Sequence, residues 1–187
     1  MIKRNRELWY ALLAIAAVSA VYLTAYRFQG SVPTASGLVG HGIGILGFAL
    51  MLMTETLYSI RKLLTDARWG NMESWLRFHI VTGLVGPYMV LLHAAMMFQG
   101  LAGVTMLLTV VVVISGVVGR YLYTAMPHAA TLPPKAAETV GVRAAQPHTH
   151  RGALATWHAL HVPLTWMLFT AAFVHVVAAL YYATLQR

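Results

Sequence analysis

The chain contains no cysteine and only five acidic residues among its 187 residues. Without cysteine it can form no disulfide, no thiolate-held zinc or iron–sulfur site and no covalently attached c-type haem. Any metal must therefore be held by histidine, methionine or oxygen ligands. None of the acidic residues falls in the middle of an apolar stretch, which disfavours a proton pump built on carboxylates. These residues are Glu7, Glu55, Asp66, Glu73 and Glu138.

Charged residues make up only 10% of the chain and hydrophobic residues 59%. Soluble domains carry about 25% charged residues, so this composition indicates an integral membrane protein with little extramembrane material. No glycine-rich loop follows a predicted strand, and flavin or NAD(P)H domains are therefore not expected. We also find no nucleophile–base–acid set, so the sequence does not indicate a stand-alone enzyme.

Five apolar stretches have about the 20 residues that a membrane-spanning helix needs. The sequence predicts an all-α membrane protein, a five-helix transmembrane bundle that forms one domain over residues 1–187. The basic start resembles a signal peptide, but its apolar run continues to Tyr26 and is interpreted as the first span, with cleavage as the lesser alternative. The predicted spans are about 8–26, 37–58, 76–98, 101–123 and 156–182.

The positive-inside rule predicts a cytoplasmic N-terminus, a periplasmic C-terminus and a cytoplasmic loop over 124–155. With this orientation only Arg27 and Arg187 of the 13 basic residues lie outside. The net charge of +8 is therefore explained by topology, and no nucleic-acid partner is expected. The prolines of the loop, Pro147 among them, argue against a continuous helix there. The inner basic residues are Lys3, Arg4, Arg6, Arg61, Lys62, Arg68, Arg77, Arg120, Lys135, Arg143 and Arg151.

Two histidine pairs share one interval within the third and fifth predicted spans. His79 and His93 are 14 residues apart, and so are His161 and His175. Fourteen residues make almost four helical turns, so each pair lies on nearly one face at levels about 21 Å apart. The predicted orientation makes both spans run outward, which pairs His79 with His161 toward the cytoplasm and His93 with His175 toward the outer face.

Histidine in a bilayer core is costly and usually functional. Two imidazoles on one haem iron leave no open coordination position, which suits electron transfer. Each histidine alone has an alternative explanation as a polar residue satisfied by a neighbouring helix, but two equal pairs on parallel spans favour ligation. The sequence therefore predicts two non-covalent b haems, held by His79 and His161 and by His93 and His175.

Other residues have weaker signals. Arg77 and Arg120 are candidate partners for haem propionates or simple topological anchors. His41 is interpreted as an interface residue, with contact to the outer haem or a quinone as alternatives, and His158 is a rival of His161 for ligation. His128, His148 and His150 are interpreted as solvated loop residues.

Small residues between the paired histidines suggest space for porphyrin rings beside the helix backbones. These residues are Gly83 and Gly86 in the third span, and Ala171 and Ala172 in the fifth. Ordinary packing between membrane helices explains such residues equally well.

The motifs His79-x13-His93 and His161-x13-His175 resemble the ferric reductase-like transmembrane domain, whose superfamily includes the NADPH oxidases. The haem arrangement is also similar to that of cytochrome b in bc complexes. This resemblance implies two b haems and electron passage across the membrane, and it reaches only the four histidines. The chain departs from the ferric reductase group in having five predicted spans rather than six and no flavin domain.

We therefore expect a dihaem cytochrome b in a bacterial inner membrane that works within a larger redox system. It would carry electrons between a cytoplasmic-side partner or the quinone pool and an outer-side redox protein, with quinone as a further candidate cofactor. One alternative is a self-sufficient quinol-linked reductase of an outer acceptor such as ferric iron or oxygen. Another is a non-redox membrane anchor or haem carrier.

Overall fold

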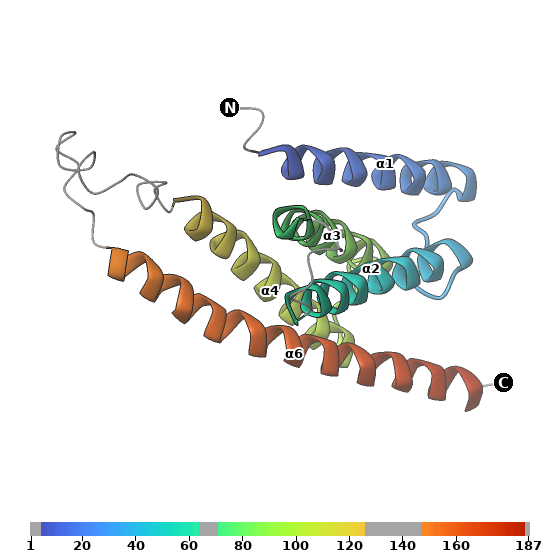
Figure 1. Cartoon of the computed structure of the whole chain (residues 1–187). Helices are drawn as coiled ribbons and strands as arrows, with labels where there is room; N and C mark the ends of the chain where they lie inside the picture. The colour runs from blue at the N-terminus through green and yellow to red at the C-terminus, as the bar shows by residue number, and fades with distance from the viewer. Residues whose placement is uncertain (1–4, 64–70, 126–146, 186–187) are drawn as a thin grey trace, which may run out of the picture. The chain divides into compact units, whose positions relative to one another are not determined.

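The structure, a computed structural model, describes residues 5–63, 71–125 and 147–185. Its elements are all α-helices (Figure 1), and five of them are long and apolar enough to cross a membrane. The predicted all-α, multi-pass membrane class is therefore confirmed. The helices are α1 (Arg6–Gln29), α2 (Leu38–Leu63), α3 (Met72–His93), α4 (Gly100–Ala125) and α6 (Pro147–Leu185).

The chain divides into two compact units, Met1–Met106 and Leu107–Arg187. The first unit contains α1, α2, α3 and the beginning of α4. The second unit contains the rest of α4 and the long helix α6. The residues 64–70 and 126–146, including His128 and Lys135 of the predicted loop, lie outside the described residues.

Local capping groups explain where α1 ends and α3 begins. Gly30 adopts the left-handed conformation with φ of 67°, and its N–H donates to the Tyr26 carbonyl at 2.9 Å, which closes α1. The Asn71 side chain accepts from the Glu73 N–H at 3.1 Å, which satisfies a donor in the first turn of α3.

The third helix differs from the predicted span 76–98 at both ends. It begins at Met72 and ends at His93, so His93 is its last residue. Ala95 and Met96 follow with positive φ values of 46° and 62°, a backbone conformation that a helix does not contain. The prediction was wrong at this end because the residues after His93 remain apolar, and hydropathy does not report backbone conformation.

The fifth helix begins earlier than the predicted span 156–182. Residues 147–155 are helical, so the prediction of a loop over this part was wrong. Pro147 is the first residue of α6, where its missing N–H removes no helical bond. The 39 residues of α6 span about 58 Å, well beyond a hydrocarbon core of about 30 Å. Pro163 lies inside α6 and Pro87 inside α3, and both helices continue through them.

A glycine pair brings α2 and α3 into close contact. A Cβ atom added to Gly47 would lie 2.9 Å from the Gly86 carbonyl oxygen, and one on Gly86 would lie 3.0 Å from the Gly47 carbonyl oxygen. The backbones therefore approach so closely that neither position has room for a side chain. In a bilayer, helices associate through such close packing and polar contacts, because lipid supplies little hydrophobic force between them.

Helix α1 packs on α3 through apolar residues and one hydroxyl pair. Ser19 Oγ and the Tyr88 hydroxyl lie 2.5 Å apart, and Ser19 also donates to the Ile15 carbonyl at 2.8 Å. The apolar core of this unit joins buried residues of α1, α2 and α3, namely Ala11, Ile43, Val85 and Met89.

We expect Gly47→Ala to lower the melting temperature of the protein in detergent micelles by several degrees. Its methyl group would meet backbone and the Met89 Cβ, and overpacking of this kind costs about 1–3 kcal/mol. Gly42 on the same helix has nothing within 4 Å of an added Cβ, so Gly42→Ala is a matched control. Equal melting temperatures for the two variants would contradict the close approach of α2 and α3.

Candidate functional site

Both histidines of α3 contact backbone carbonyl groups of α2. His79 Nδ1 lies 3.3 Å from the Thr54 oxygen, and His93 Nδ1 lies 2.9 Å from the Gly40 oxygen. A carbonyl oxygen can only accept, so Nδ1 donates its proton in both contacts. In a neutral imidazole this leaves the lone pair on Nε2, which is the atom needed to bind a metal. Each ring is therefore held in one tautomer by its neighbour.

These two contacts and the glycine pair follow one register. His79 faces Thr54, Gly86 faces Gly47 and His93 faces Gly40, as shown by the printed contacts. Each step of seven residues along α3 is matched by seven residues back along α2. Antiparallel helices with contacts every seven residues pack as in a coiled coil, which keeps one seam in contact along its length. The histidine interval of 14 residues is two such steps.

Helix α2 also supplies aromatic groups beside both rings. The Tyr58 ring centroid lies 4.8 Å from that of His79, and the His41 ring approaches that of His93 edge-on at 6.4 Å. A Cβ atom on Gly44 would lie 2.6 Å from Cγ and Nδ1 of His93. Gly44 therefore provides the space in which the His93 ring lies against α2. His41, which the sequence placed at the interface, is exposed and belongs to the surroundings of His93.

Gly83 and Gly86 do not leave space open on α3. An added Cβ on Gly83 would lie 3.7 Å from Thr54 Cγ2, and Gly86 meets the α2 backbone. The expectation that they admit a porphyrin is therefore wrong, and close helix packing accounts for them. The Thr54 hydroxyl also donates to the Thr82 hydroxyl at 2.6 Å, which joins the two helices beside Gly83.

In the second unit, α4 and α6 hold the His161 ring. His161 Nδ1 lies 3.0 Å from the Ser115 hydroxyl oxygen, and the Trp157 ring stacks on His161 with centroids 5.0 Å apart and planes at 23°. The Trp157 Nε1–H donates to the Ser115 carbonyl at 2.7 Å. An added Cβ on Gly119 would overlap the Trp157 indole, so this glycine provides the space for that ring.

His175 follows His161 by 14 residues on α6 and lies on the same face. Leu168 and Ala172 on this face are buried, so Ala172 is occupied by packing. His158 is exposed, and its ring lies 6.3 Å from that of Trp157.

The two arginines proposed for propionates have different settings. Arg77 forms an ion pair with Glu73, one turn earlier on α3, and both side chains are largely exposed. Arg120 lies near the end of α4.

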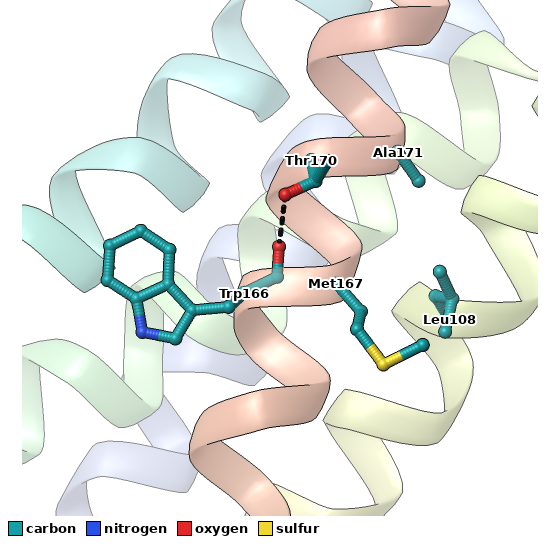
Figure 2. A pocket seen from close by; sticks show the side chains of 5 residues that line it. All are labelled: Leu108, Trp166, Met167, Thr170 and Ala171. Carbon is teal, nitrogen blue, oxygen red and sulfur yellow. Dashed lines mark hydrogen bonds between the residues drawn. The ribbon is translucent and has the colours of Figure 1, made fainter.

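A shallow apolar groove of about 430 Å³ runs along α6 between the levels of His161 and His175. Figure 2 shows its lining, in which the Trp166 ring points away from Leu108 and Met167. Thr170 supplies its hydroxyl to the Trp166 carbonyl at 2.9 Å, and the lining side chains include no imidazole or carboxylate. Ala171 lies in this lining, so it is the one proposed small residue with open space beside it.

Within the described part of the chain, no three histidine, aspartate or glutamate side chains gather as a metal site. A bis-histidine haem needs only two protein ligands, so this finding does not bear on the predicted pairs. His79 and His93 belong to the first unit and His161 and His175 to the second, and their pairing across units stays a prediction. Comparisons with protein-family models, curated proteins and solved structures find no match to this chain.

The contacts of Trp157 predict a measurable loss when its N–H is removed. Trp157→Phe keeps an aromatic ring but deletes the bond to the Ser115 carbonyl, which costs about 1 kcal/mol. For a chain of this size we expect the melting temperature to fall by about 2–4 °C. Trp166 on the same helix is 64% exposed, so Trp166→Phe is the matched control and should change little. A larger fall for Trp166→Phe would contradict this assignment.

Proposed function

We propose that the protein is a dihaem cytochrome b that carries electrons across a bacterial inner membrane. His79 and His161 would ligate one iron toward the cytoplasm, and His93 and His175 the other toward the outer face. The partners would be a cytoplasmic-side protein or the quinone pool on one side and a redox protein on the other, within a larger complex. The resemblance to the ferric reductase-like domain belongs to this proposal.

The observation that carries the proposal is the state of the α3 imidazoles. Carbonyl acceptors at Thr54 and Gly40 require the proton on Nδ1 and leave the lone pair on Nε2. Metal-ligating histidines almost always donate their other ring N–H to an acceptor, which fixes ring orientation and raises ligand basicity. The residues present therefore fit an axial role for His79 and His93. A histidine kept only for packing would not need the same arrangement at both ends of one helix.

The 14-residue interval adds a spatial argument. It separates two ligand levels by about 21 Å along each helix, so charge can pass between two fixed sites within the membrane. Moving a charge across the full potential corresponds to about 2.3 kcal/mol per 100 mV. A bound haem supplies one-electron oxidation and reduction, and two histidine ligands close the iron to other ligands. The histidines themselves hold the irons, fix their levels and keep substrates off them.

We expect purified protein to contain two b haems per chain, measured by a reduced-minus-oxidised spectrum with haem quantification. Loss of one ligand pair should remove one haem, because each pair belongs to one iron. The double variant His93→Ala/His175→Ala should retain one haem, and His79→Ala/His161→Ala should retain the other.

Matched controls for this experiment lie beside the ligands. His158 is one turn from His161, and His41 lies near His93, so single alanine variants at these positions should keep both haems. Absence of haem from the unaltered protein, or two haems in the His93→Ala/His175→Ala variant, would refute the proposal.

The orientation supports the same proposal through the distribution of basic residues and is testable because the chain has no cysteine. We expect a membrane-impermeant maleimide added to spheroplasts to label Ser31→Cys, between α1 and α2. We expect Ala136→Cys, in the predicted cytoplasmic loop, to be labelled only after the membrane is opened. The reversed labelling pattern would show that the orientation is wrong.

A further inference from the structure

One of the histidine contacts differs in kind from the other two. His79 and His93 face backbone carbonyl oxygens, whereas His161 faces the hydroxyl of Ser115 at 3.0 Å. A carbonyl group can only accept, so it permits one imidazole tautomer. A hydroxyl group can accept or donate, so it permits both. Side-chain substitution can also remove the hydroxyl, but it cannot remove a carbonyl.

The direction of this bond determines whether His161 can ligate through Nε2. If Ser115 accepts, the proton is on Nδ1 and the lone pair is on Nε2. If Ser115 donates, Nδ1 has the lone pair and Nε2 carries the proton of the neutral ring, which cannot then bind iron through that atom. Ligation of His161 through Nε2 therefore requires Ser115 to be the acceptor.

Both partners of this bond are held in place by neighbouring groups. Trp157 stacks on the His161 ring and donates to the backbone carbonyl of Ser115 at 2.7 Å. An added Cβ on Gly116 would lie 3.7 Å from His161 Cε1, so the ring also lies against the α4 backbone. The hydroxyl and the imidazole thus have a fixed separation that does not depend on the hydrogen bond alone.

We propose that Ser115 is a positioning residue for His161, whose hydroxyl accepts the Nδ1 proton and lowers the reduction potential of the iron that His161 ligates. This inference rests on the proposed function. Donation from Nδ1–H makes the imidazole a stronger electron donor through Nε2, which favours the oxidised iron. Hydrogen bonding around the ligands is one of the ways in which a protein sets a haem potential.

Potentiometric titration of the haem-loaded full chain tests the inference with Ser115→Val and Ser115→Thr. The two side chains have nearly the same shape, and only threonine keeps the hydroxyl. Loss of such a partner typically changes metal affinity by about tenfold or more. If this change falls on the oxidised form, tenfold corresponds to a rise of about 59 mV in one haem for Ser115→Val. Ser115→Thr and the other haem should keep the potentials of the unaltered protein.

Two further variants define the outcomes. Ser115→Ala removes the hydroxyl without adding bulk and replaces the valine variant if that protein does not assemble. Ser19→Ala removes a hydroxyl that contacts Tyr88, not a histidine, and should leave both potentials unchanged. An unchanged potential in the variants without the hydroxyl, or equal shifts in Ser115→Thr and Ser115→Val, would overturn the role of Ser115 while leaving the dihaem proposal intact. Absence of haem from the unaltered protein would overturn both.

Discussion

The close approach of Gly47 and Gly86 is the contact on which the first unit depends. It brings the α2 backbone near enough for two of its carbonyl groups to reach imidazoles on α3. A side chain at either glycine would move the helices apart, and hydrogen bonds of 2.9 and 3.3 Å tolerate little movement. The packing that stabilises this helix pair is thus also the packing that orients its histidines.

The number and class of the helices were predictable from the sequence, because an apolar stretch of sufficient length has few other solutions in a membrane. The helix ends were less predictable. Apolar residues continue past His93 although the backbone turns there, and Pro147 was interpreted as a break although a helix can begin with proline. Hydropathy records which solvent a segment prefers, whereas these ends depend on backbone dihedral angles and local donors.

The four histidines of the candidate site were identified from their spacing, but their supporting groups were missed. Gly40 and Thr54 act through backbone oxygens, which no residue type announces. Gly44 was detectable in principle, because small residues at positions 40, 44 and 47 form a stripe on one face of α2. Ser115 carries no local signal, since only the packing of α4 on α6 brings it to His161.

The seven-residue register between α2 and α3 restricts how this helix pair can change in length. Inserting one residue in either helix between the histidine contacts would rotate everything beyond it by about 100° and remove one histidine from its carbonyl. The pair can grow only by adding seven residues to both helices together, which is about 10 Å of length. Adaptation to a slightly thicker bilayer would therefore have to occur outside the segment between the two histidines, at the helix ends and in the turns.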